Sequence, residues 1–197
     1  MANDTGLTGD WEMAELFLGK MVNQLPAMTL KMMKREAELL RGTIVQTITS
    51  SGGGSWKPLS LWTLAIRRHN SIGGTKPLIA SGEMRQSITA NVYPSSMSAF
   101  VGVNYNAKRK DGGSSVDIAK IQEYGAEYVV KRTKKQVAFL RYIYSQNPVL
   151  WGLISSGKNK DGMTKVSIPA RPFMEPSGVK WSRDYEGRMK NFLKDYM

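Results

Sequence analysis

Apolar residues recur every three or four positions along the first fifty residues, which is the spacing of one face of an α-helix. Asp10 can cap a helix that begins there, and Pro26 suits either the first turn of a second helix or a kink between two helices. The pattern therefore predicts a short helix after Asp10 and a long helix over about 26–49. The recurring residues are Trp11, Ala14, Leu18, Met21, Val22 and Leu25, followed by Leu30, Met33, Ala37, Leu40, Ile44 and Ile48.

The glycine-rich stretch 50–55 ends this helical pattern and resembles a flexible linker. Ser60 can cap a short helix over 60–69. Residues 78–88 read as a loop and a helical turn that enters a strand. Apolar and polar residues then alternate over 88–93 and again over 98–103, with a Pro-Ser-Ser turn between them. This alternation predicts an antiparallel hairpin.

The second half of the chain predicts shorter elements. Ser115 can cap a helix that runs to Tyr124 and ends at Gly125, and a short strand follows at 128–130. A helix over 137–144 ends before Pro148. A strand at 166–168 precedes the prolines, and Ser177 can cap a last helix. The aromatic face of this last helix contains Trp181, Tyr185, Met189, Phe192 and Tyr196.

These elements predict an α+β fold in which a small antiparallel β-sheet packs against a long N-terminal helix and a C-terminal amphipathic helix. We expect a single domain over 1–197. Its parts are a flexible tail at 1–9, N-terminal helices at 10–50, an α+β core at 56–176 and the C-terminal helix at 177–197.

Composition narrows the class of protein. The formal net charge is +12, and residues 57–141 hold 14 basic and 5 acidic groups, so most of the excess lies in the middle of the chain. Such a field attracts polyanions, either nucleic acid or an acidic protein surface, although a generally basic surface is an equally good reading. The chain has no cysteine, which excludes disulfides and thiolate metal sites. No membrane span or export signal is evident, and we expect assembly in a reducing cytoplasm.

Motifs that would indicate catalysis are missing from the sequence. His69 is the only histidine, and it follows two arginines, as at a solvated helix end. No acidic residue is followed two positions later by lysine, a pairing that many metal nucleases use. Glu83-Met84-Arg85 and Glu186-Gly187-Arg188 come closest, and each reads more simply as salt bridging on a helix. We expect neither an enzyme nor a cofactor.

The stretch 168–174 (Ile-Pro-Ala-Arg-Pro-Phe-Met) organises the rest of the pattern. Two prolines three positions apart exclude a helix interior and a central strand, so the segment is extended. Phe173 and Met174 are apolar anchors, and Arg171 is a permanent cation. In one interpretation the segment covers the chain's own core, and in the other it forms part of an interface with another protein chain.

Five separated stretches together resemble one family. They are Trp56-Lys57-Pro58-Leu59 with Thr63, the segment 77–88 (Pro-Leu-Ile-Ala-Ser-Gly-Glu-Met-Arg-Gln-Ser-Ile), the segment 101–107 (Val-Gly-Val-Asn-Tyr-Asn-Ala), the segment 119–126 (Ala-Lys-Ile-Gln-Glu-Tyr-Gly-Ala) and 168–173. Their order resembles that of the tail-completion or virion-morphogenesis proteins of tailed bacteriophages, the Mu-type group and its neck-protein relatives. The similarity spans roughly residues 56–176.

The resemblance implies a virion structural protein, assembled in the host bacterial cytoplasm, that forms a ring, usually of six subunits, in the neck or at the top of the tail. The ring would join the tail tube, and in contractile tails the sheath, to the head connector, with double-stranded DNA passing through its lumen. A ring repeats one heterologous contact until it closes. On this reading Arg171, Phe173 and Met174 belong to the contact between subunits, and Lys108, Arg109 and Lys110 face the DNA.

The residues themselves leave two other classes of protein open. The first is a basic nucleic-acid-binding module outside any virion, and the second is a metal-dependent nuclease. For Phe173 the alternative is the core of its own chain, and for 108–110 it is a solvated loop. The stretch 1–25 and the loop after Tyr105 extend beyond the pattern of the family.

Overall fold

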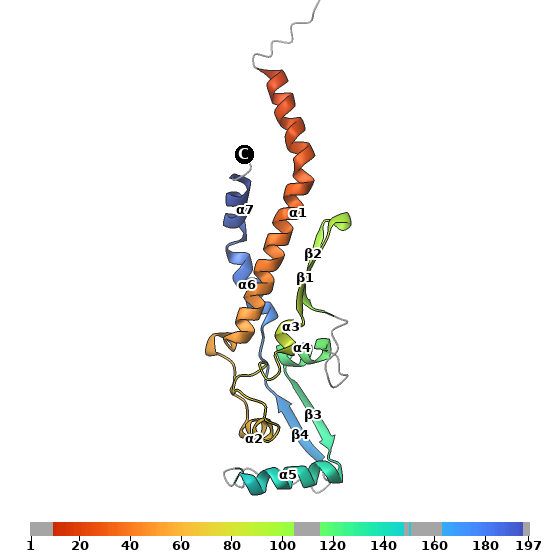
Figure 1. Ribbon diagram of the computed structural model, residues 1–197, viewed down its shortest axis with the longest axis vertical. Coiled ribbons are helices and arrows are strands. Elements are labelled where there is room, and N and C mark those ends of the chain that lie inside the picture. Colours follow the sequence, from red (N-terminus) through yellow and green to blue (C-terminus); the bar gives the residue numbers. More distant parts are fainter. Residues whose placement is uncertain (1–9, 105–114, 148–149, 151–162, 195–197) are drawn as a thin grey trace, which may run out of the picture.

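The computed structural model describes residues 10–104, 115–147, 150 and 163–194. It is elongated, with one long helix at one end and a helix lying across the other end (Figure 1). The described helices are α1 (Trp11–Thr49), η1 (Gly52–Gly54), α2 (Leu61–His69), α3 (Glu83–Gln86), η2 (Pro94–Ser96), α4 (Ser115–Tyr124), α5 (Lys134–Gln146), α6 (Met174–Arg183) and α7 (Tyr185–Lys194). The described strands are β1 (Ile88–Tyr93), β2 (Ser98–Val103), β3 (Ala126–Lys131) and β4 (Met163–Ile168).

The N-terminal pattern forms one helix instead of the expected two. The Asp10 side chain accepts a hydrogen bond from the backbone N–H of Met13 at 3.0 Å, and the helix then continues past Pro26 to Thr49. Proline removes one helical hydrogen bond, but this part of α1 is exposed, so water can satisfy the carbonyl that is left free. The predicted tail at 1–9 lies outside the described residues.

The main core lies where the C-terminal half of α1 meets the hairpin β1–β2, α4 and the start of α6. The spacing of four between Ile44 and Ile48 places both on one face of α1, and both are fully buried. Ile88 at the start of β1 and Phe173 are also fully buried. The buried members of this cluster are Ile44, Ile48, Trp56, Ile88, Ala119 and Phe173.

The strands confirm the α+β class, but they form two separate two-stranded sheets. β1 and β2 pair antiparallel with Ile88 opposite Val103 and Tyr93 opposite Ser98, as the alternating pattern predicts. β3 pairs antiparallel with β4, with Ala126 opposite Ile168. This second ribbon connects the main core to α5 (Figure 1). A second, smaller cluster joins α2 to α5 through Ala65, Ile143 and Leu150.

The C-terminal helix begins earlier than predicted and is divided in two. Ser177 lies within α6, is fully buried, and its hydroxyl is 2.8 Å from that of Thr47 on α1, so it does not cap the helix. Asp184 separates α6 from α7. Arg188 on α7 donates to both carboxylate oxygens of Glu36 on α1, with a shortest distance of 2.7 Å, and this bidentate pair raises the pKa of Arg188.

The N-terminus of α6 is instead capped by a residue about fifty positions earlier. The buried carboxylate of Glu123, on α4, accepts backbone N–H groups from Phe173 at 2.8 Å, Met174 at 3.0 Å and Glu175 at 3.0 Å. The first N–H groups of a helix have no partner within the helix, and a negative charge there is favourable. Glu123 therefore fixes the start of α6 to the end of α4.

Gly125 allows this contact. Its φ of +75° lies in the left-handed region, and a Cβ there would come within 2.9 Å of the Ala170 nitrogen and the Ile168 carbonyl oxygen. The backbone N–H of Arg171 donates to the Gln122 carbonyl at 2.6 Å. The Glu-Tyr-Gly turn and the Pro-Ala-Arg-Pro-Phe segment are therefore packed directly against each other.

We expect Glu123→Gln to lower the free energy of unfolding by about 2–4 kcal/mol, because hydrogen bonds to a buried charged group are lost or weakened. Urea denaturation followed by circular dichroism measures this change. Glu175→Gln is the matched control, because it removes one negative charge from the same helix end at an exposed position. Equal effects of the two substitutions would show that the buried cap contributes no more than an exposed charge.

Candidate functional site: a basic groove between α2, α5 and β4

Of the three residues expected at a subunit interface, Phe173 lies in the chain's own core, Met174 packs against that core and Arg171 is buried beside a groove. Phe173 is fully buried within the main cluster, and Met174 is partly buried against it. Arg171 is 6% exposed. In this conformation Phe173 has no exposed side-chain surface to offer a second copy. Lys108, Arg109 and Lys110 lie outside the described residues.

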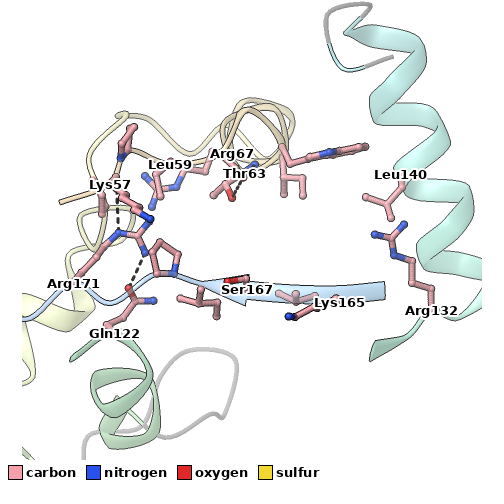
Figure 2. Close-up of a pocket in the computed structure, with 18 of the residues that line it drawn as sticks. Lys57, Leu59, Thr63, Arg67, Gln122, Arg132, Leu140, Lys165, Ser167 and Arg171 are labelled. Atoms are coloured by element: carbon pink, nitrogen blue, oxygen red, sulfur yellow. Dashed lines mark hydrogen bonds between the residues drawn. The ribbon is translucent and has the colours of Figure 1, made fainter. Parts of the chain in front are cut away.

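Arg171 instead closes one end of a groove that the sequence did not indicate. The groove lies between α2, α5 and β4 and has a volume of about 1360 Å³ (Figure 2). Trp62 on α2 and Tyr144 on α5 meet edge to face there, with ring centroids 4.2 Å apart. Leu59, Leu140 and Ile168 extend this apolar lining. Small-molecule pockets are usually smaller, about 300–1,000 Å³.

The charged residues among the described lining of the groove are all basic. Six of the described lining residues are cations and none is an acid, and the cations are Lys57, Arg67, Arg132, Arg141, Lys165 and Arg171. Figure 2 shows Lys57, Arg67 and Arg171 toward one end and Arg132 toward the other. Among the described residues, only Lys165 of these six is in an ion pair, with Glu127 at 2.8 Å.

Arg171 is held by neutral oxygens. Its Nη1 donates to the side-chain oxygen of Gln122 at 3.1 Å, and its Nε and Nη2 donate to the Lys57 carbonyl, each at 3.4 Å. Burial lowers the pKa of Arg171 from its usual value, and the nearby Arg67 charge lowers it further. The guanidinium remains charged at neutral pH and has no ion-pair partner in the described part of the chain, so an anion entering the groove would compensate its charge.

Arg67 has a comparable environment. Its Nη1 donates to the carbonyls of Gly74 at 3.3 Å and Lys76 at 3.0 Å, and burial lowers its pKa. On the α5 side, burial raises the pKa of Tyr144, while the charge of Arg132 partly opposes this shift. The groove therefore combines an apolar wall with a positive field, and it can bind a partly apolar, negatively charged group.

The sequence missed this site because its cations come from separated segments. Lys57 precedes α2, Arg67 lies in the last turn of α2, Arg132 precedes α5, Arg141 lies on α5, and Lys165 lies on β4. The one available signal was the excess of basic residues in 57–141, which gives the sign of the field but not its location.

Neither a cluster of metal-ligating side chains nor a membrane-spanning helix occurs in the described part of the chain. No cluster of three or more histidine, aspartate or glutamate side chains that could hold a metal occurs among residues 10–104, 115–147, 150 and 163–194. The His69 ring contacts the rings of Phe139 and Tyr142 on α5, with centroids 5.4 Å and 5.3 Å away. None of the helices in these ranges is both long and apolar enough to cross a bilayer.

Comparison of the chain with models of known protein families, with curated proteins and with solved structures gives no match.

We expect Phe173→Ala to lower the free energy of unfolding of the monomer by about 3–5 kcal/mol, because it leaves a cavity in the main core. Met174→Ala is the comparison, and its effect should be smaller because Met174 is only partly buried. Thermal and urea unfolding measure both. Unchanged monomer stability together with lost self-association would instead place Phe173 at an interface.

Proposed function

We propose that this chain is a structural protein of a tailed-bacteriophage virion that forms a ring in the neck or at the top of the tail. It would act in tail completion, tail termination or head–tail joining, with DNA passing through the ring. Its partners would be further copies of itself, the tail-tube and sheath proteins, the head connector and the packaged DNA. On this proposal the protein works by binding and not by catalysis.

The observation that carries the proposal is the apolar surface of the first part of α1. Residues 11–25 extend beyond the elements packed on the rest of the helix (Figure 1), and most of their apolar side chains are exposed. Trp11 is 54% exposed, Leu18 59% and Val22 68%. Soluble monomers seldom expose a continuous apolar stripe of this kind, so we infer that it is covered in an assembly.

The motifs that carry the family resemblance support the same proposal. Glu123 and Gly125 are in contact with the Pro-Ala-Arg-Pro-Phe segment, although 45 to 50 positions separate the residues that touch. The residues of these motifs therefore form part of the packed interior of the protein. Such residues are expected to be common to proteins that share a fold while their exposed surfaces fit different neighbours.

The basic field suits a channel for DNA. A ring around packaged DNA needs contacts to phosphate but no reading of bases. With a net charge of +12, the chain can supply such contacts from lysine and arginine without a sequence-specific element.

Mass spectrometry of purified particles made from the genome that encodes this chain tests the proposal. We expect the protein in the particles at about six copies each, the number that the resemblance implies. Deletion of its gene should leave filled heads and separate tails. Complete particles that lack the protein would contradict the proposal.

The groove also favours a second candidate, a nucleic-acid-binding module outside any virion. In that case the free protein should bind duplex DNA with an affinity that falls steeply with salt, and Arg132→Gln/Arg141→Gln should reduce the slope by about 2. Lys180→Gln/Arg183→Gln, on exposed positions of α6, is the control. A flat salt dependence would exclude this class.

A further inference from the structure

The first part of α1 carries acidic residues beside its apolar stripe. Among residues 10–25 the charged side chains are Asp10, Glu12, Glu15 and Lys20, so this segment is acidic in a chain that is otherwise strongly basic. Glu15 lies four positions after Trp11 and three before Leu18, which places it beside the stripe, and Glu12 lies one turn earlier. Both glutamates are exposed. We call residues 11–25 the arm.

The arm and the basic groove have matching chemistry. The arm presents an apolar stripe bordered by carboxylates, and the groove presents apolar side chains bordered by guanidinium and ammonium groups. Arg132 and Arg141 are exposed, so their charges are accessible to an approaching helix. Charge complementarity of this kind orients a partner and favours the correct register.

The two surfaces cannot meet within one chain. The arm lies at one end of the molecule, and α2, α5 and β4 lie at the other (Figure 1). α1 is one continuous helix of 39 residues, which corresponds to a rod about 58 Å long. The end of the rod is fixed in the core by Ile44 and Ile48, so the arm cannot fold back to the groove.

We propose that the arm of one copy docks in the basic groove of the next copy, with Glu12 and Glu15 facing Arg132 and Arg141. This inference rests on the proposed ring function, because it names the contact between neighbouring subunits. The contact joins different surfaces of the two copies, so a docked pair still has one free arm and one free groove with which to bind further copies. Repetition of such a contact closes a ring when the rotation per subunit allows it, and otherwise forms a filament.

A pair of charge-reversal variants tests the contact. Glu12→Lys/Glu15→Lys gives a basic arm with the native groove, and Arg132→Glu/Arg141→Glu gives an acidic groove with the native arm. Each variant alone brings like charges together, so we expect its self-association to be about tenfold weaker than that of the wild type or worse. A 1:1 mixture restores opposite charges at every contact and should assemble again, with the two variants alternating.

Analytical ultracentrifugation of the full-length proteins at low ionic strength measures these associations. All four positions are exposed, so circular dichroism should show that each variant is folded, and Lys180→Glu/Arg183→Glu is the control for a change of charge away from the groove. Recovery of assembly in the mixture, with neither variant assembling alone, is the expected result.

Two outcomes would overturn the inference. If each variant alone associates as the wild type does, the subunits meet through another surface, and the proposed function stands if particles still contain the protein. If the wild type and the mixture both remain monomeric, the docking is wrong, and the protein content of the particles decides the proposed function separately. Loss of duplex DNA binding by the groove variant, with unchanged association of the arm variant, would assign the groove to nucleic acid.

Discussion

The fold depends on one buried carboxylate. Glu123 accepts three backbone N–H groups at the start of α6, and this contact joins α4 to α6. α6 in turn packs on α1, where the Ser177 and Thr47 hydroxyls meet. The end of α4 also places Arg171 at the end of the groove, because the backbone N–H of Arg171 donates to the Gln122 carbonyl. A change at Glu123 is therefore expected to reach both the core and the groove.

This arrangement leaves two unlike surfaces at opposite ends of the molecule, the arm on α1 and the groove between α2, α5 and β4 (Figure 1). The exposed apolar stripe of α1 has no cover among the described elements, and within the same part of the chain Lys165 is the one groove cation that forms an ion pair. Each surface by itself would be unfavourable in a free monomer. Together they suit a protein that acts by contact with further copies, and the groove field suits either an acidic partner or DNA.

Much of the fold could be predicted from short stretches of sequence, because the alternation of apolar and polar residues and the capping of helices each involve only a few neighbouring positions. The hairpin over 88–103, the Ser60 cap of α2 and the end of α4 at Gly125 are of this kind. The cap of α6 was missed because Glu123 lies about fifty residues away, and a local serine, Ser177, suggested a later start. The helical spacing of apolar residues also identified the arm as a helix, but this spacing does not show whether another element or another protein covers the apolar stripe. The groove could not be predicted, because its cations come from separate segments.

A cryo-electron microscopy reconstruction of the neck and upper tail of particles made from this genome tests the central claim, that the chain functions as a subunit joined head to tail. We expect a closed ring in which each arm lies against α2 and α5 of the adjacent copy, with the C-terminal half of α1 and α6 packed as in the monomer. A particle in which no ring has this fold, or a ring whose arms contact nothing, would contradict it.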